Sequence, residues 1–563
     1  MKVVIIGGVA GGATAAARIR RLDERAEVIV FERSGFISYA NCGLPYYIGD
    51  VITDSQELTL QTPESFWRRF RIDMRVRHEV TAIDPARKTV TVRKLDTGEV
   101  FEEYYDKLLL SPGAKPALPK FPGMDNEKLF VLRTVEDTLR IHTFREQQNP
   151  ASAVIVGGGF IGLEMAENLR GLGMEVTIVQ LLDQLLGQLD YDMASFVHAK
   201  MREKGVNLML SHSVEGFEKS ENAVKVLLKD TQPLNADMVV LAIGVSPDTH
   251  LAESAGLKRG VRGSIAVNER METSAPDIYA VGDAVEVRHS VTGEKTLISP
   301  AGPANKQGRI AADNICGGDS VYRGAQGSSV IKVFDMTVAT TGINEQGARD
   351  AGINCDKVFL SPASHASYYP GGKLMTIKVL FEKETYRLLG AQIIGFDGVD
   401  KRIDVLATAM LAGLTALQLK DLDLAYAPPY SSAKDPVNMA GFMIENIAEG
   451  TLKQFHWHEA DSLPRSGSVT LLDTRTPAEY ASGHMDGFVN IPVDELRDRI
   501  GELAAEKPVY VVCQSGLRSY IACRLLSQNG FDCYNLSGGY RLYEAVTKDR
   551  MVAERALPCG MDI

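Results

Sequence analysis

The sequence predicts an α/β protein of several domains, and three observations support this fold class. Apolar strands such as VVIIG and AVIVG run directly into glycine turns and helices, which is typical of parallel α/β units. After about residue 325 the order changes to strands followed by helices, and a fresh small α/β pattern begins near residue 464. A chain of 563 residues is also long enough for several separate cores.

Composition excludes several classes of partner. A content of 45% hydrophobic and 24% charged residues is typical of a globular protein. The net charge of −11 argues against nucleic acid or an anionic membrane as the main partner. Met1 leads straight into a strand without a signal peptide, and no apolar run reaches transmembrane length. Seven scattered cysteines are typical of a reducing compartment, so we expect a cytoplasmic protein without membrane insertion or a metal site.

The stretch VIVGGGFIGLE predicts a dinucleotide site. Gly157, Gly159 and Gly162 complete the pattern GxGxxG between a strand and a helix, where a pyrophosphate rests on the helix N-terminus. Gln180 ends the next strand, at a position where NAD sites usually carry an acid. The following LLDQLL contains no Arg or Lys for a 2′-phosphate, which favours NADH and leaves NADPH as the alternative.

The N-terminal stretch GGVAGG predicts a second such site. It supplies Gly7 and Gly12, with Val9 where the middle glycine is expected. Glu32 ends the strand EVIVFE and provides the acid that ribose binding requires. Asp283, in SAPDIYAVGDAV, follows a strand and a glycine and is suited to hold a polar, hydroxylated tail.

A single cysteine, Cys42, stands in SGFISYANCGLPYYIG. Asn41 is a good helix N-cap and Pro45 is tolerated in a first helical turn, so Cys42 is expected at a helix N-terminus. The helix dipole would favour its thiolate there. No second cysteine follows within reach, and Cys42 must therefore react with something that arrives from outside.

Three motifs in order, IIGGVAGG, LLLSPGAKP and TSAPDIYAVGDA, resemble those of the two-dinucleotide flavoprotein disulfide reductases. The resemblance implies FAD on the first fold and NADH or NADPH on the second. It implies this set of FAD contacts: Gly7, Ala10, Gly12, Glu32, Arg33, Val80, Ser111, Gly113, Arg133, Asp283 and Ala301. The second dinucleotide would lie against Gly157, Gly159, Gly162, Gln180 and Gly244.

Further motifs resemble the coenzyme A-disulfide reductase branch of that family. These are SYANCGLPYYIG, SHASYYPGGK and LAYAPPYSSAKDPVN, the last two from the dimerisation domain. The resemblance implies a homodimer in which Tyr368 (or Tyr369) and Tyr426 reach the partner subunit's active site and hydrogen-bond or protonate a leaving thiolate. It implies these coenzyme A contacts: Thr14, Arg18, Arg21, Ser38, Asn41, Asn305 and Lys434.

The C-terminal stretch VYVVCQSGLRS predicts sulfur transfer. A buried strand leads to Cys513 and to a loop whose successive N–H groups form an anion nest suited to a thiolate or persulfide. Cys513 and Arg518 make C-x4-R, tighter than the C-x5-R of cysteine phosphatases, and the segment resembles a rhodanese domain. We expect Arg518 to support the loop charge or shape, and Asp473, Arg475, Glu479 and His484 to hold the domain's loops. We expect Cys523 and Cys533 in the core, and no role for Cys316, Cys355 and Cys559.

Taken together, the motifs resemble those of coenzyme A-disulfide reductase–rhodanese fusions, also described as NADH-dependent persulfide or polysulfide reductases. The domains expected are FAD-binding at 1–115 and 245–324, NAD(P)H-binding at 116–244, dimerisation at 325–445, a linker at 446–463 and rhodanese at 464–563. In the implied mechanism Cys513 captures sulfane sulfur, coenzyme A carries it, and Cys42 releases hydrogen sulfide with electrons from NADH through FAD.

Two alternatives remain open at this point. NADH oxidases and peroxidases use one cysteine at the place of Cys42 through sulfenic acid, but they carry a histidine where this sequence has Ala10. The rhodanese domain could instead donate sulfur to a biosynthetic partner while the flavin half regenerates thiols.

Overall fold

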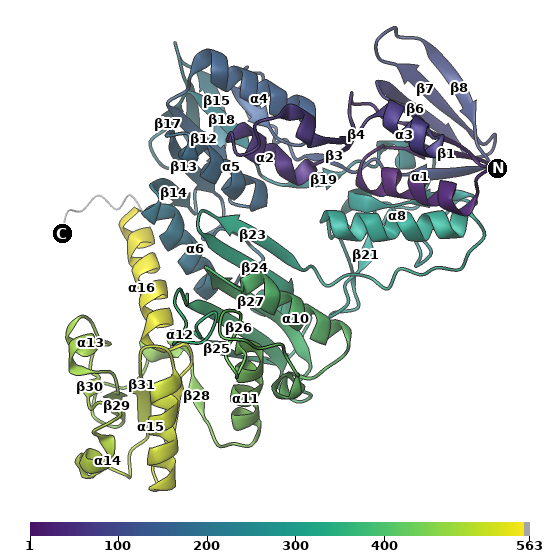
Figure 1. Cartoon of the computed structure of the whole chain (residues 1–563). Helices are drawn as coiled ribbons and strands as arrows, with labels where there is room; N and C mark the ends of the chain where they lie inside the picture. Colours follow the sequence, from purple (N-terminus) through teal and green to yellow (C-terminus); the bar gives the residue numbers. More distant parts are fainter. Residues whose placement is uncertain (557–563) are drawn as a thin grey trace. The chain divides into compact units, whose positions relative to one another are not determined.

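The structure, a computed structural model, describes residues 1–556 (Figure 1). Cys559 lies outside these residues. The chain forms two compact units, Met1–Asp183 with Gly205–Gly327, and Gln184–Lys204 with the residues from Ser328 onward. Both units are mixed α/β, which confirms the predicted fold class. Within the described residues, no helix combines the length and apolar character that a membrane crossing requires.

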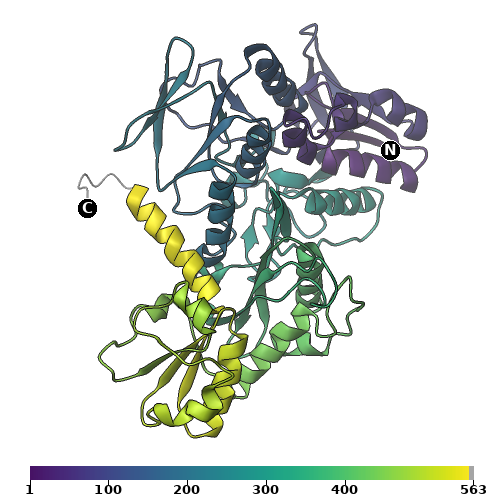
Figure 2. The same ribbon diagram turned by 60° about the vertical axis from the view of Figure 1, so that its left-hand side comes forward.

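The first unit contains a parallel sheet built around the N-terminal strand. Its strands, in spatial order, are β20 (Ile278–Ala280), β9 (Lys107–Leu110), β1 (Lys2–Ile6), β2 (Glu27–Phe31) and β5 (Asp73–Arg75). Strand β1 is buried along most of its length, as expected for a parallel strand covered on both faces. Helices α1 (Ala10–Leu22) and α8 (Ala301–Ile315) lie side by side (Figures 1 and 2). A Cβ on Gly308 would lie 2.4 Å from the Gly11 carbonyl oxygen, so glycine permits this approach.

The same unit holds a second parallel sheet for the second dinucleotide. Its strands, in spatial order, are β11 (Leu129–Val131), β18 (Met238–Leu241), β12 (Ser152–Val156), β13 (Glu175–Gln180) and β14 (Val206–Leu210). Helices α4 (Val135–Gln148) and α5 (Phe160–Gly171) accompany it. Each parallel sheet has a three-stranded antiparallel companion: β6 (His78–Asp84), β7 (Thr89–Lys94) and β8 (Val100–Tyr104), and β15 (Val214–Lys219), β16 (Val224–Leu228) and β17 (Leu234–Ala236).

The second unit begins with an antiparallel sheet. Its strands, in spatial order, are β23 (Ser329–Val333), β24 (Met336–Gly342), β27 (Leu388–Gly395), β26 (Met375–Glu382) and β25 (Cys355–Leu360). Helices α10 (Val399–Leu411) and α11 (Pro436–Ala448) share its core. Helix α6 (Tyr191–Glu203) packs with this unit although its sequence lies within the range expected for the NAD(P)H-binding domain.

The C-terminal part of the second unit is a parallel sheet flanked by helices. Its strands, in spatial order, are β28 (Gln454–Phe455), β32 (Cys533–Leu536), β31 (Val509–Val512), β29 (Thr470–Asp473) and β30 (Val489–Asn490). The main helices are α15 (Leu517–Gln528) and α16 (Gly539–Ala556). Strand β28 lies inside the segment that the sequence predicts to be a linker. It belongs to the sheet, because its backbone pairs with β32 and Phe455 is buried in the sheet's core.

A buried lysine connects the parts of the second unit. Lys378 in β26 is 1% exposed, and its Nζ lies 2.8 Å from Asp190 Oδ2, 2.9 Å from Asp192 Oδ1 and 2.5 Å from Glu345 Oε1. Asp190 and Asp192 belong to the start of α6, and Trp457 Nε1 donates to Asp192 Oδ2 at 3.2 Å. The cluster therefore ties the antiparallel sheet to α6 and to the short helix α12 (Trp457–Ala460).

We predict that Lys378→Met lowers the free energy of unfolding by about 3–5 kcal/mol, because it leaves buried carboxylates without their cation. Burial alone would raise the pKa of Glu345, but Lys378 and Lys357 hold it down to about 2. The stabilisation is thus complete above pH about 4.5, the ordinary value, and is lost as the pH falls toward 2. Urea denaturation between pH 2 and 7 measures the loss of stability in the variant and its pH dependence.

The control is Lys373→Met at an exposed position, which should change the free energy of unfolding by less than about 0.5 kcal/mol. Equal stability of the two variants would contradict the role given to Lys378.

Candidate active site

The first glycine turn joins β1 to α1 and leaves no room for a side chain at Gly7 and Gly12. Gly7 has a φ of 99°, and a Cβ on Gly12 would lie 1.9 Å from the Gly7 carbonyl oxygen. The helix therefore begins directly against the strand, with its first N–H groups unpaired within the helix. This is the geometry that a pyrophosphate requires.

Glu32 follows β2 and is held by the same turn. Its Oε2 accepts a hydrogen bond from the Gly8 N–H at 2.8 Å, and its Oε1 accepts one from the Ser34 N–H at 2.9 Å. Burial raises the pKa of Glu32, and the two amides oppose the rise. The carboxyl group is thus fixed where a ribose-binding acid is expected.

Residues from three distant segments meet near Asp283. Arg133 Nη2 donates to Asp283 Oδ2 at 2.6 Å, and a Cβ on Gly113 would lie 3.7 Å from the Arg133 guanidinium. Burial raises the pKa of Asp283, while Arg133 opposes the rise. The rest of the expected FAD set lies in the same unit: Ala10 at the start of α1, Arg33 paired with Asp248, Val80 in the core, Ser111 against Gly7, and Ala301 at the start of α8.

The second glycine turn repeats this geometry. Gly157 has a φ of 111°, and a Cβ on Gly162 would lie 2.1 Å from the Gly157 carbonyl oxygen. Gly159 is the N-cap of α5 and faces open space, and Gly244 follows β18 with a φ of 112°. Gln180 Oε1 accepts from the Gly158 N–H at 3.2 Å, as Glu32 does in the first turn. The residues present therefore fit two dinucleotides.

Cys42 is exposed in a 3-10 turn, η1 (Asn41–Gly43), that leads into the short helix α2 (Leu44–Ile48). Pro45 occupies the first turn of α2, as the sequence predicts. The prediction that Asn41 caps this helix is wrong, because η1 intervenes and neither turn has a side-chain cap among the described residues. The predicted thiolate stabilisation is also wrong: partial burial raises the pKa of Cys42, and the negative charge of Glu164 adds to the rise.

Glu164 is a site residue that the sequence reasoning missed. It lies in α5, which packs against α2, and burial with the nearby Glu167 raises its pKa to about 7. The pKa of Tyr46 is also raised, to about 12, mainly by burial and next by the charge of Glu164. A carboxyl group with a pKa of about 7 thus lies near enough to Cys42 for its charge to raise the pKa of that thiol. No local motif announces it, because its partner is 122 positions away in the sequence.

The expected coenzyme A contacts are brought together only in part. Thr14 Oγ1 donates to Asn305 Oδ1 at 3.0 Å across the contact of α1 with α8. Arg18 is paired with Asp313 at 2.7 Å, whereas Arg21 is exposed. The other members are placed as follows: Ser38 at a φ of 44° with its N–H bound to the Gly8 carbonyl, Asn41 in η1, and Lys434 exposed in the second unit.

The two predicted tyrosines meet. Tyr368 and Tyr426 are 72% and 45% exposed, and their hydroxyl oxygens lie 2.6 Å apart in a hydrogen bond. This bond raises the pKa of Tyr426. Tyr369 instead packs edge-on against His365, with ring centroids 5.6 Å apart. Of the two neighbouring tyrosines, Tyr368 is therefore the one paired with Tyr426.

Arg402 holds the two tyrosine segments together, and the sequence reasoning also missed it. It is 1% exposed, and its Nη2 donates to the Ser364 carbonyl at 2.9 Å, to Ser431 Oγ at 3.2 Å and to Asp435 Oδ2 at 3.1 Å. It is a positioning residue, because its partners come from the segments that carry the tyrosines. A lone arginine on a helix gives no sequence signal of such a role.

Cys513 is fully buried at the end of β31. Its Sγ accepts hydrogen bonds from the Gly516 N–H at 3.1 Å and the Ser519 hydroxyl at 3.1 Å. Gly516 has a φ of 97°, which brings its N–H around to the sulfur. One backbone N–H and one side-chain hydroxyl thus donate to the sulfur, whereas the sequence predicts a nest of successive backbone N–H groups.

The neighbouring charged residues hold loops. Arg518 binds both oxygens of Glu479 at 2.7 Å, and its hydrogen bond is the largest cause that lowers the pKa of Glu479 to about 2. Asp473 and Arg475 are buried and paired at 2.7 Å, and Arg475 also donates to the Gly483 carbonyl. His484 stacks on the ring of Tyr480, with a centroid distance of 3.9 Å.

The other cysteines of the described chain lie away from these motifs. Cys523 and Cys533 are buried, and Cys533 Sγ donates to the Cys523 carbonyl at 3.1 Å, as expected for core residues. Cys316 and Cys355 are partly buried, on a helix end and a strand.

The chain belongs to the pyridine nucleotide-disulphide oxidoreductase family. Residues 1–308 match the family's main domain, residues 328–436 its dimerisation domain, and residues 456–545 a rhodanese-like domain. It is therefore a flavin-dependent oxidoreductase with a fused rhodanese-like domain, as the motifs indicate.

Three relatives share most of this arrangement. Coenzyme A disulfide reductase of Staphylococcus aureus is 35% identical over 442 residues, which are 78% of this chain and 99% of that protein. The crystal structure of reduced Bacillus anthracis CoADR-RHD is 49% identical with a TM-score of 0.95, covering 98% of each chain. The structure of an NAD-dependent persulfide reductase from A. fulgidus is 39% identical with a TM-score of 0.91, covering 96% of this chain and 100% of that one.

We predict that Glu164→Gln speeds the alkylation of Cys42 by iodoacetamide severalfold near pH 8. Above pH about 7 the Glu164 carboxylate disfavours the Cys42 thiolate, so removal of its charge lowers the pKa of the thiol. The measurement is the pH profile of labelling at Cys42, read by peptide mass spectrometry. The exposed Glu175→Gln in the same domain is the control and should label as the wild type does. An unshifted profile in Glu164→Gln would show that this carboxyl group does not act on the thiol.

Proposed function

We propose that this protein reduces coenzyme A disulfide, coenzyme A persulfide and polysulfide to thiols and hydrogen sulfide, with NADH as electron donor. The observation that carries the proposal is that one chain holds two dinucleotide turns, an exposed cysteine next to helix α2, which packs against α5 of the second turn, and a buried cysteine whose sulfur accepts two hydrogen bonds. The relatives named for coenzyme A disulfide and persulfide reduction support the same chemistry.

Cys42 is the redox centre of the proposal. FAD and NADH, when bound, supply an electron pair to the cysteine site. The Cys42 thiolate attacks the sulfur of a disulfide or the sulfane sulfur of a persulfide, forms a new S–S bond and displaces the coenzyme A thiolate. Two electrons then cleave the new bond. This returns the Cys42 thiolate and releases a second thiolate from a disulfide, or hydrosulfide from a persulfide.

Cys513 is the sulfur acceptor of the rhodanese domain. Its thiolate attacks a polysulfide, takes one sulfur atom as a persulfide and releases a polysulfide chain shorter by that atom. Gly516 and Ser519, which donate to Sγ, are placed to stabilise negative charge on the sulfur. The Glu479–Arg518 pair keeps the loop in shape. Coenzyme A thiolate then removes the outer sulfur and restores Cys513.

The tyrosine pair is proposed to act across a homodimer. Tyr368 and Tyr426 are exposed, as is Tyr430 at 71%, on the domain that matches the family's dimerisation domain. A hydroxyl pair at 2.6 Å can donate a proton to a leaving thiolate, because one hydroxyl supports the charge that develops on the other.

Coenzyme A is proposed to be held by Thr14, Asn305 and Arg21, with further contacts from Arg18, Ser38, Asn41 and Lys434. We propose NADH and not NADPH as the electron donor. Gln180 accepts a hydrogen bond from the Gly158 N–H, and the following LLDQLL offers no cation for a 2′-phosphate. Reactive thiols at Cys42 and Cys513 require a reducing setting, which supports a cytoplasmic location.

We predict a division of labour between the two cysteines. Under anaerobic conditions with NADH, Cys42→Ser should lose both coenzyme A-disulfide reduction and sulfide release from polysulfide. Cys513→Ser should lose only sulfide release, because the disulfide reaches Cys42 without it. Cys316→Ser is the matched control and should behave as the wild type does. Full polysulfide activity in Cys513→Ser would mean that the rhodanese domain serves another acceptor.

The homodimer predicts complementation between inactive subunits. Cys42→Ser and the double variant Tyr368→Phe with Tyr426→Phe are mixed under conditions that exchange subunits. In a mixed dimer, one site combines an intact Cys42 with the partner's intact tyrosines, so random exchange should give about a quarter of the wild-type coenzyme A-disulfide rate. No recovery, with exchange verified by mass, would place both groups in one subunit's site. Wild-type activity of the double tyrosine variant by itself would remove the tyrosines from the reaction.

A further inference from the structure

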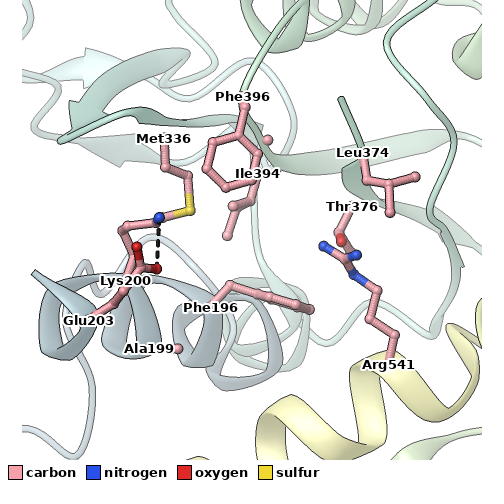
Figure 3. A pocket seen from close by; sticks show the side chains of 11 residues that line it. Phe196, Ala199, Lys200, Glu203, Met336, Leu374, Thr376, Ile394, Phe396 and Arg541 are labelled. Carbon is pink, nitrogen blue, oxygen red and sulfur yellow. Dashed lines mark ion pairs between the residues drawn. The ribbon is translucent and has the colours of Figure 1, made fainter. Parts of the chain in front are cut away.

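A small cavity lies within the second unit, and neither Cys42 nor Cys513 is among its lining residues. Its volume is about 130 Å³, and it is enclosed by α6, by strands of the antiparallel sheet and by the start of α16 (Figure 3). Phe196, Met336, Ile394 and Phe396 give it apolar walls. Leu374 and Phe396 are 47% and 39% exposed, which leaves a way in from solvent.

One end of this cavity carries an uncompensated cation. Arg541, in the first turn of α16, lines the cavity, and its guanidinium carbon lies 5.8 Å from the ring of Phe196. Among the described residues, its guanidinium has no carboxylate partner, and its Nε is buried without a hydrogen bond. Burial lowers the pKa of Arg541, and no neighbouring acid offsets this. A desolvated cation of this kind is costly to the protein unless an anion meets it.

The opposite end of the cavity differs. Lys200 also lines it, but its Nζ is paired with Glu203 Oε2 at 2.8 Å (Figure 3). The same Nζ lies 3.3 Å from Asp335 Oδ1. Thr376, 3% exposed, adds a hydroxyl to the lining, and no hydrogen bond of this hydroxyl is found in residues 1–556. The free polar capacity therefore comes from Arg541 and Thr376.

We propose that this cavity binds a small carboxylate with one ring or a short chain as its apolar body. The planar guanidinium of Arg541 matches a carboxylate in two parallel hydrogen bonds, and the aromatic and aliphatic walls receive the body. An apolar cavity of about 150 Å³ holds a benzene ring, so this one has room for a ligand of about that size and not for a nucleotide.

The site would be linked to the sulfurtransferase loop. The backbone N–H of Arg541 donates to the Gln514 carbonyl at 3.0 Å, and that of Tyr540 donates to the Cys513 carbonyl at 2.8 Å. The residue that meets the ligand thus also contacts the loop of Cys513. A carboxylate bound here stabilises α16 against α6 and the sheet, and with it the support of that loop.

The test is calorimetric titration of the full-length protein with benzoate, with benzamide as its uncharged isostere and with acetate as charge without a ring. The wild type should bind benzoate about ten- to a hundredfold more tightly than benzamide, the usual worth of hydrogen bonds to a charged group. Acetate should bind more weakly than benzoate. Benzoate binding should be unchanged by saturating coenzyme A.

Two variants separate the charge from the space. Arg541→Gln keeps the backbone N–H and should remove the preference for benzoate over benzamide, whereas the exposed Arg497→Gln should retain it. Ala199→Trp, at an exposed lining position, should fill the cavity and abolish binding of both ligands with Arg541 intact. Circular dichroism verifies that each variant is folded.

Several results would overturn the proposal. These are the absence of saturable benzoate binding at tens of millimolar, equal affinity for benzoate and benzamide, or wild-type affinity in Arg541→Gln. Competition by coenzyme A would assign the cavity to that substrate instead. None of these outcomes depends on the redox activity of Cys42 or Cys513, so the cavity is tested separately from the proposed function.

Discussion

The arrangement of the second unit depends on one buried charge. Lys378 is almost fully enclosed, and it is retained there because Asp190, Asp192 and Glu345 surround it. An unpaired charge of either sign is costly in such a place, so neither partner is compatible with the interior without the other. The carboxylates come from α6 and α9 (Glu345–Asp350), and Asp192 also accepts a hydrogen bond from Trp457 Nε1. One cluster therefore holds the antiparallel sheet, α6 and the C-terminal part together.

The two dinucleotide turns show how the same constraint selects different side chains. In both turns, a glycine with positive φ follows the strand. A second glycine, at the start of the helix, lies so close to the first that a Cβ on it would be only about 2 Å from the first glycine's carbonyl oxygen. The next strand then returns a side chain to the turn's amide, Glu32 in one case and Gln180 in the other. The backbone contact needs only an acceptor oxygen, which both side chains supply. The difference in charge therefore bears on the ligand and not on the fold.

The two reactive cysteines lie in opposite electrostatic surroundings. Cys42 is exposed at the surface, but partial burial of its sulfur raises the pKa of its thiol, and the charge of Glu164, from a distant part of the same unit, adds to the rise. Cys513 is buried, but an amide and a hydroxyl point at its sulfur. In the proposed reaction, Cys42 exchanges electrons with a cofactor and Cys513 holds a persulfide, and these two tasks have different needs. The first would benefit from a thiol whose pKa a neighbour can shift, and the second from donors fixed on the sulfur.

The sequence by itself determined the α/β class, the two glycine turns, the single cysteine at Cys42 and the C-x4-R loop of Cys513, because each depends on residues close together in the chain. It also indicated the tyrosine pair, through segments that resemble a known domain. It misjudged the surroundings of Cys42 and placed a linker where β28 joins a sheet. Only the tertiary structure decided that Glu164 lies near enough to Cys42 to act on its thiol, that Arg402 ties the tyrosine segments and that Arg541 has no carboxylate partner within residues 1–556. These contacts join residues far apart in sequence, and a single charged residue on a helix carries no local signal of the partner that folding brings to it.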